Sequence, residues 1–111
     1  MRRALRFSPR FVEQLQGVLG LVAREQPAAA KRLGVRVEHA LELISDYPEI
    51  GRVRPELGPV ERSLLVGSWN VIYRPAANHL VMLAFIHAHQ DLHPYEFDGI
   101  ERGDPPLSPL P

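Results

Sequence analysis

The sequence predicts a small α+β domain in which a helical hairpin packs on a mainly antiparallel sheet. Residues 9–46 carry apolar side chains at helical spacing, with one interruption at Gln26-Pro27. Residues 60–87 contain three runs rich in β-branched and aromatic residues, separated by turn signals. A chain of 111 residues has room for one core, because domains usually span about 100 to 150 residues.

The first elements are a short strand and a helix. Residues 3–7 form an apolar and basic run that predicts the strand, and Ser8 is the expected N-cap of the helix that begins at Pro9. The apolar stripe of this helix consists of Phe11, Leu15, Val18, Leu19 and Val22. Gly17 and Gly20 each destabilise the helix by about 1 kcal/mol relative to alanine. Because they lack a side chain, we expect them to permit close packing against a second helix.

The second helix begins at Pro27 and ends before Tyr47-Pro48. Its apolar stripe consists of Ala30, Leu33, Val37, Ala40, Leu41 and Ile44. Because only a tight turn separates the two helices, they form an antiparallel hairpin whose apolar stripes need a sheet to cover them.

Three strands follow a connection rich in turn residues. The runs are Val60–Val66, Trp69–Arg74 and Leu80–His87. Gly67-Ser68 is a two-residue hairpin signal, and Pro75–Asn78 suits a second hairpin, so the three runs predict an antiparallel meander. Leu80–Ile86 is apolar almost without alternation, which is typical of a strand covered on both faces.

Composition narrows the class of protein. Thirteen basic residues balance thirteen acidic ones, so no overall field steers the chain to nucleic acid or to an anionic membrane. The absence of cysteine excludes disulfides and thiolate chemistry and suits the cytoplasm. We expect no secretion signal and no membrane span. We expect one domain over residues 1–102 and an unstructured tail over 103–111, which has four prolines in its last seven residues.

Several motifs resemble those of a known family. In chain order they are Ala4-Leu5-Arg6-Phe7-Ser8-Pro9-Arg10, Pro27-Ala28-Ala29-Ala30-Lys31-Arg32-Leu33, the run from Pro48 to Gly58, Arg62-Ser63-Leu64, Val66-Gly67-Ser68-Trp69 and Tyr73-Arg74. With the order of elements, they resemble the RelE and ParE toxin superfamily over about residues 4–92. The motifs from Pro48 onward are similar to the ParE-type, plasmid-stabilisation pattern. The resemblance implies a β-α-α-β-β-β fold.

The resemblance also implies a function. Toxins of this superfamily act in type II toxin-antitoxin systems, and a cognate antitoxin wraps the toxin with its C-terminal segment. ParE-like members block DNA gyrase, which is the target we expect, whereas RelE-like members cut messenger RNA on the ribosome. Gln90 occupies a position at which many ParE-like chains have an arginine. A third hypothesis is therefore that the chain is an inactive relative that survives as a binding module. We expect no cofactor.

The hypothesis of a ribonuclease requires a particular set of side chains. RNA cleavage without metal requires cations for the phosphate and groups that move protons. Arg62 and Arg74 are candidates for the first role, and His87, His89 or Tyr95 for the second. The alternative is that both arginines form surface ion pairs or contact the antitoxin. The near absence of lysine favours binding over catalysis; an active enzyme would be a metal-independent endoribonuclease.

The histidines near the last strand also raise the question of a metal site. His87 and His89 alternate and so share a face, and His93 is close enough in sequence to join them as a zinc ligand. No acidic residue with clear ligand spacing completes the set. We therefore expect structural histidines and no metal, and we interpret Asp91 as a turn or capping residue.

Further arginines are candidates for recognition. Arg52 and Arg54 lie in a loop punctuated by glycine and proline, and loops on a firm scaffold commonly carry binding residues. The alternative is pairing with Glu49, Glu56 or Glu61, which contributes only about 0 to 1 kcal/mol when exposed.

Two other features predict contact with a target or antitoxin. Trp69, the single tryptophan, is an interface anchor if exposed and a core residue if not, and we expect partial burial. Arg24, Arg32 and Arg36 lie on the two predicted helices, where they would attract an acidic antitoxin tail.

Overall fold

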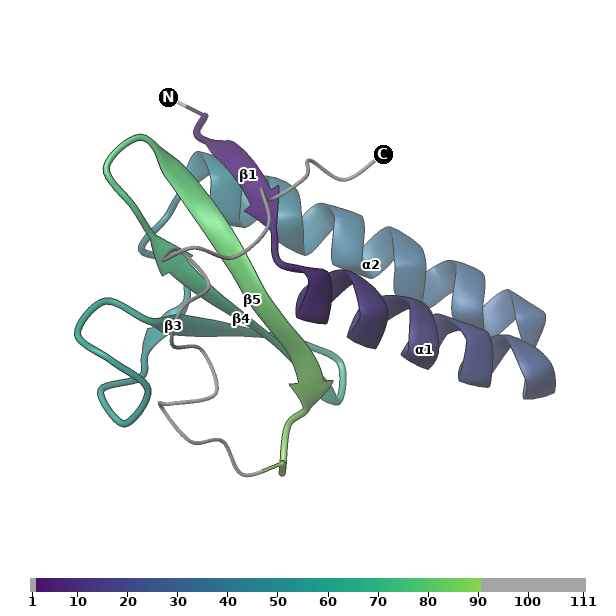
Figure 1. Cartoon of the computed structure of the whole chain (residues 1–111). Coiled ribbons are helices and arrows are strands. Elements are labelled where there is room, and N and C mark those ends of the chain that lie inside the picture. Colours follow the sequence, from purple (N-terminus) through teal and green to yellow (C-terminus); the bar gives the residue numbers. More distant parts are fainter. Residues whose placement is uncertain (1, 91–111) are drawn as a thin grey trace.

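The structure, a computed structural model, describes residues 2–90, and within them the chain forms two helices and five strands (Figure 1). In chain order these are β1 (Ala4–Phe7), α1 (Pro9–Glu25), α2 (Pro27–Asp46), β2 (Arg52–Val53), β3 (Arg62–Val66), β4 (Trp69–Pro75) and β5 (His79–His87). The helices lie side by side against one face of the sheet (Figure 1). The α+β class and the helical hairpin are confirmed.

The sheet has the strand order β1-β5-β4-β3-β2. The predicted meander of β3, β4 and β5 is confirmed, with β3 starting two residues later than expected, at Arg62. β1 adds to β5 as a parallel strand, so that Ala4 pairs with His79 and Phe7 with Met82. The two-residue strand β2, which the sequence pattern does not predict, pairs with the start of β3. The expected tail, 103–111, and the domain limit at residue 102 lie outside the described residues.

Ser8 joins the start of α1 to the sheet. Its Oγ accepts a hydrogen bond from the N–H of Phe11 at 3.1 Å, which confirms the predicted N-cap. The same hydroxyl donates to the carbonyl oxygen of Leu83 at 2.9 Å. The backbone N–H of Ser8 donates to the carbonyl oxygen of Met82 at 3.0 Å. Ser8 is 1% exposed, so these bonds fix the direction in which α1 leaves β1.

Gly17 and Gly20 do not have the role expected of them. A Cβ atom at either position would meet no other atom within 4 Å, so contact between α1 and α2 does not require glycine there. The prediction was wrong because both residues are exposed, whereas the fully buried residues of α1 are Phe11 and Leu15.

Both faces of β5 are buried, as its apolar run predicts. Every residue from Leu80 to Ile86 is buried. Leu80, Met82 and Phe85 pack with the helices, whereas the second core cluster, on the opposite face, contains Leu57, Ile72, Val81, Leu83, Ala84 and Ile86. The register with β4 shifts between Ile72 and Tyr73, which explains why two consecutive residues, Leu83 and Ala84, belong to the same cluster.

The Tyr73 side chain links the turn after α2 to strand β4 by hydrogen bonds. Its hydroxyl donates to the carbonyl oxygen of Pro48 at 2.7 Å and accepts from the N–H of Gly51 at 2.9 Å. A Cβ on residue 51 would lie 2.7 Å from this hydroxyl oxygen, so only glycine fits. Burial raises the pKa of Tyr73 above its ordinary value. The turn that leads into β2 is therefore held by one side chain of β4.

We predict that Tyr73→Phe lowers the free energy of unfolding by about 1 to 3 kcal/mol, because two buried backbone groups lose their partner. Urea denaturation measures the change, and Tyr47→Phe, which removes an exposed hydroxyl, is the matched control with an expected effect near zero. An equal loss in both variants would contradict the prediction.

The same variant has a pH signature. Because burial raises the pKa of Tyr73, the unfolded chain releases the phenolic proton first as pH rises past the ordinary value of 10.0. Stability is therefore retained below pH 10 and lost above it, and this loss should be smaller in Tyr73→Phe than in the unaltered chain.

Candidate functional site

The loop between β2 and β3 is held in a fixed shape. The N–H of Arg54 donates to the carbonyl oxygen of Glu61 at 2.9 Å, and the N–H of Leu57 donates to that of Arg54 at 2.9 Å. The side chain of Leu57 is buried in the core cluster that lies away from the helices. The loop therefore holds Arg54 in a fixed position, whereas Arg52, which the sequence places in the loop, is the first residue of β2.

Arg54 and Arg52 differ in how they are held. Nε of Arg54 donates to Oε2 of Glu56 at 2.8 Å, and Nη1 donates to Oγ of Ser63 at 3.0 Å, so the pairing with Glu56 that the sequence allows is observed. Through this hydrogen bond Arg54 holds the pKa of Glu56 below its ordinary value. Arg52 is exposed and, within residues 2–90, forms no hydrogen bond or ion pair, although its charge also contributes to lowering the pKa of Glu56. Its guanidinium is available to a partner.

The Arg62 side chain forms hydrogen bonds with the turn after α2. Its Nη1 donates to the carbonyl oxygens of Glu49 at 3.1 Å and Gly51 at 2.8 Å. Gly51 also donates its N–H to Tyr73, which is paired with Arg62 across the two strands. Arg62 therefore satisfies backbone carbonyl groups of the chain itself.

Arg74 neutralises a buried carboxylate. Its Nε donates to Oε2 of Glu61, whose side chain is only 3% exposed. Oε1 of Glu61 accepts a hydrogen bond from the N–H of Val60 at 3.3 Å. A Cβ at position 58 would lie 2.0 Å from this oxygen, so the carboxylate fits here only because residue 58 is glycine. Sequence analysis did not predict the burial of Glu61, which it considered only as a partner for Arg52 or Arg54.

The candidate ribonuclease residues are not brought together. Arg62 lies opposite Tyr73 and shares its face of the sheet, whereas Arg74, the next residue along β4, points to the other face. His87 lies opposite Trp69, four residues from Tyr73 along β4, which is about 13 Å at the usual rise per residue. Tyr95 lies outside the described residues.

His87, the last residue of β5, contacts both His89 and Trp69. The rings of His87 and His89 have centroids 5.4 Å apart, and the N–H of His89 donates to Nδ1 of His87 at 3.2 Å. Among residues 2–90 no group of three histidine, aspartate or glutamate side chains is arranged to hold a metal ion. His93 and Asp91 lie outside this range.

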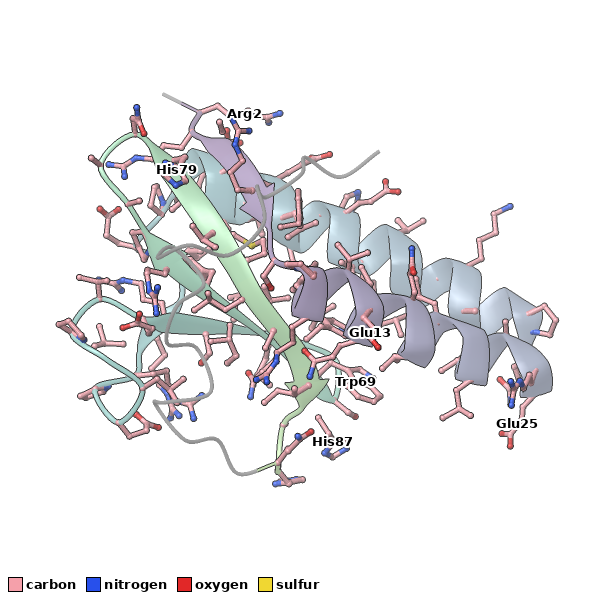
Figure 2. All side chains as sticks on the ribbon, viewed as in Figure 1. Arg2, Glu13, Glu25, Trp69, His79 and His87 are labelled. Atoms are coloured by element: carbon pink, nitrogen blue, oxygen red, sulfur yellow. The ribbon has the colours of Figure 1, made fainter. Side chains whose placement is uncertain are left out.

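Trp69 is half-buried beside α1, as expected. Its ring stacks on Phe85 with centroids 5.5 Å apart, and His87 approaches its edge at 5.4 Å. Figure 2 shows Trp69 and His87 together at the end of β5. A hollow of about 260 Å³ lies here between Trp69, Val18 and Leu21. Trp69 thus has one side in the core and borders an open apolar hollow.

Arg24, Arg32 and Arg36 are all exposed on the helical hairpin. Arg36 also lies over the turn between β3 and β4, because its Nη1 would be 3.2 Å from a Cβ on Gly67. Gly67 has φ +64°, the left-handed conformation that this two-residue turn requires. The three arginines remain accessible to a partner.

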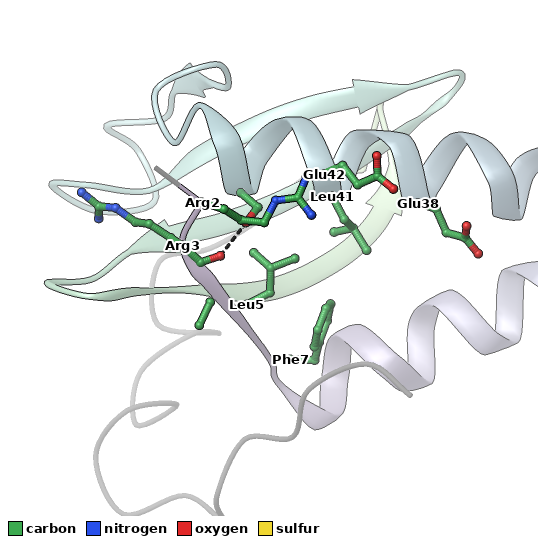
Figure 3. A pocket seen from close by; sticks show the side chains of 9 residues that line it. Arg2, Arg3, Leu5, Phe7, Glu38, Leu41 and Glu42 are labelled. Carbon is green, nitrogen blue, oxygen red and sulfur yellow. Dashed lines mark hydrogen bonds between the residues drawn. The ribbon is translucent and has the colours of Figure 1, made fainter.

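A hollow of about 410 Å³ between β1 and α2 was not predicted from the sequence (Figure 3). Leu5, Phe7 and Leu41 supply its apolar wall, and Glu38 and Glu42 lie one helical turn apart beside it. Within residues 2–90, neither α1 nor α2 combines the length and hydrophobicity that a membrane span requires.

Comparison with known proteins identifies the family. The two helices on a five-stranded mixed sheet, counted within residues 2–90, match the fold of a chain in a solved toxin-antitoxin structure. The family model described as ParE toxin of type II toxin-antitoxin system, parDE, matches residues 5–92. The chain belongs to the ParE toxin family.

A solved structure supports the fold. It is described as the chromosomal ParDE TA system from P. aeruginosa, and it superposes with a TM-score of 0.66 at 13% sequence identity. The match covers 78% of this chain and 96% of that chain. No curated protein matches the sequence.

We predict that Arg74→Ala lowers the free energy of unfolding by about 3 kcal/mol, because it leaves the buried carboxylate of Glu61 without its partner. Chemical denaturation measures the loss. Arg52→Ala removes an exposed arginine and should change stability by about 0.5 kcal/mol or less. Adding Glu61→Gln to Arg74→Ala should restore part of the loss; an equal, small effect of both single variants would exclude this structural role.

Proposed function

We propose that this ParE-family toxin acts by binding an essential target, DNA gyrase, in the cytoplasm, and that a cognate antitoxin neutralises it. The observation that supports binding over RNA cleavage is the state of the two arginines that a ribonuclease would need. Arg62 is bonded to backbone carbonyl oxygens, and Arg74 is paired with a buried carboxylate. Membership of the ParE family supports gyrase as the target.

The geometry of the remaining candidates agrees with this proposal. Arg62 and Arg74 point to opposite faces of the sheet and so do not converge on one phosphate. The exposed arginines, by contrast, lie on surfaces that a protein partner can reach: Arg52 on strand β2, and Arg24, Arg32 and Arg36 on the helical hairpin. Arginine is well suited to such interfaces because its planar fork binds carboxylates with two donors.

We propose that the hairpin arginines attract an acidic segment of the antitoxin. Arg24, Arg32 and Arg36 are exposed on the two helices, and exposed apolar side chains such as Leu21 and Val35 lie on the same helices. An amphipathic acidic segment would satisfy both kinds of surface. Electrostatic attraction of this kind acts most strongly at low salt.

Controlled expression in bacteria tests the target. We expect filamentation and induction of the SOS response, intact messenger RNA, and inhibition of supercoiling when the purified chain is added to gyrase. Trp69→Ala should weaken inhibition if the half-buried ring touches the target. Co-expression of the neighbouring gene product, the candidate antitoxin, should restore growth.

The opposite pattern would support the ribonuclease alternative. Cleavage of messenger RNA at ribosome-bound codons, lost in a folded Arg62→Ala variant, with gyrase unaffected, would overturn the gyrase proposal. Circular dichroism of the variant serves as the control, because Arg62 also holds the turn at Gly51. Growth unaffected by expression would instead indicate a binding module without toxicity.

Charge reversal tests the role of the hairpin. The triple variant Arg24→Glu, Arg32→Glu and Arg36→Glu should bind the antitoxin at least roughly tenfold more weakly at low salt, and the difference should shrink as salt rises. Isothermal titration calorimetry measures both. The triple lysine variant keeps the charge and should keep most of the affinity; unchanged affinity of the glutamate variant at low salt would refute the proposal.

A further inference from the structure

β1 lies at one end of the sheet, and part of its outer side is occupied by α2. On its inner side β1 pairs with β5, and the N–H of Ser8 continues this pairing by donating to Met82 at 3.0 Å. On its outer side, the N–H of Arg3 donates to the carbonyl oxygen of Ser45 at 3.0 Å, and the hydroxyl of Ser45 donates to the carbonyl oxygen of Arg3. The end of α2 therefore occupies this edge at Arg3.

The edge is open beyond that point. Backbone groups of a strand alternate between its two sides, so Leu5 and Phe7 direct theirs to the same outer side as Arg3. The carbonyl oxygen of Leu5 accepts a hydrogen bond of 3.3 Å from Arg6. Within residues 2–90, the N–H groups of Leu5 and Phe7 have no partner on this side. Unpaired groups at the edge of a sheet are a template for another strand.

The hollow of about 410 Å³ between β1 and α2 runs along this open edge (Figure 3). Leu5 and Phe7 face the helices and pack with the main core, and Leu41 forms the opposite wall. Side chains of an added strand would alternate between the two faces of the sheet, so every second one would point toward α2. Contact with Leu5 and Leu41 favours apolar residues at these positions.

Two glutamates of α2 give the hollow a negative rim. Glu38 and Glu42 are exposed, and within residues 2–90 neither forms a hydrogen bond or an ion pair. Arg2 lies close enough to be affected by the charge of Glu42, but it is paired with Asp46 at 3.0 Å. The Arg3 side chain points away from the hollow, toward a carbonyl oxygen of the turn between β4 and β5 (Figure 3). The uncompensated charge beside the open edge is therefore negative.

This arrangement distinguishes between possible occupants. Because Ser45 blocks the edge at Arg3, an antiparallel second copy would pair through Leu5–Phe7 and place the Arg6 residues of both copies opposite each other, which is unfavourable. An acidic segment of the antitoxin would meet the two glutamates of the rim. A basic segment meets neither obstacle. Of the two partners that the proposed function requires, this leaves the target.

We propose that the open edge of β1 at Leu5–Phe7, with the hollow beside it, binds an extended basic segment of the target protein as an added strand. Apolar side chains of the segment contact Leu5 and Leu41, and a lysine or arginine pairs with Glu38 or Glu42. The inference rests on the proposed function for the existence of a target. It adds the surface that binds the target and the charge of the bound segment.

Charge reversal on α2 tests this assignment, with purified gyrase as the probe. Glu38→Lys combined with Glu42→Lys should raise the concentration of the chain that half-inhibits supercoiling at least roughly tenfold at low salt. Glu13→Lys combined with Glu25→Lys makes the same change of net charge at exposed positions of α1 and should leave inhibition unchanged. Thermal unfolding verifies that both variants fold. Equal effects of the two double variants would overturn the inference.

Antitoxin affinity of the α2 variant separates the two partners. Isothermal titration calorimetry should give the affinity of the unaltered chain. A loss of antitoxin affinity with unchanged inhibition of gyrase would assign the hollow to the antitoxin and overturn the inference. Inhibition by the unaltered chain that persists fully in the α2 variant would overturn the inference and leave the proposed function standing. An unaltered chain that does not inhibit gyrase would overturn both.

Amide hydrogen exchange tests the added strand. In the complex of the full chain with gyrase, the N–H groups of Leu5 and Phe7 should exchange at least roughly tenfold more slowly than in the free chain. A complex without this protection would overturn the inference. Protection in the free chain would do the same: at every concentration it would show that the chain covers its own edge, and with rising concentration it would identify a second copy.

Discussion

The two hydrogen bonds of the Tyr73 hydroxyl fix the turn on which the arginine-bearing loop depends. They hold Pro48 and Gly51 beneath the sheet, and Arg62 binds the carbonyl oxygens that this turn presents. β2 starts directly after Gly51, so its short pairing with β3 and the exposure of Arg52 follow from the same contact. One buried phenol thus holds the turn whose carbonyl oxygens bind Arg62 and after which Arg52 begins β2.

The local parts of the fold could be predicted from the sequence. Ser8, Pro9 and Gly67 act through bonds and backbone conformations within a few residues, so their effects are visible in the pattern. The pairing of β1 with β5 joins residues 75 positions apart, as Ala4 with His79, so the sequence pattern predicted the first strand but not its partner. β2 was missed because two paired residues leave no periodic pattern.

The candidate site was less accessible to sequence reasoning. The pairing of Arg54 with Glu56 was among the alternatives because the two are close in the chain. The partners of Arg62 are carbonyl oxygens, which every residue has, so no side-chain pattern reveals them. The burial of Glu61 depends on the backbone at Gly58 and on Arg74, thirteen positions away.

The order of the strands has a consequence for synthesis. β5 lies between β1 and β4 and is buried on both faces, yet it is the last described element to leave the ribosome. At about 5 to 20 residues per second, residues 47–78, which separate α2 from β5, take roughly 2 to 6 s to translate. During that time both helices exist without the strand that completes their core. A message cut before codon 79 would therefore yield a chain that cannot assemble the toxin fold.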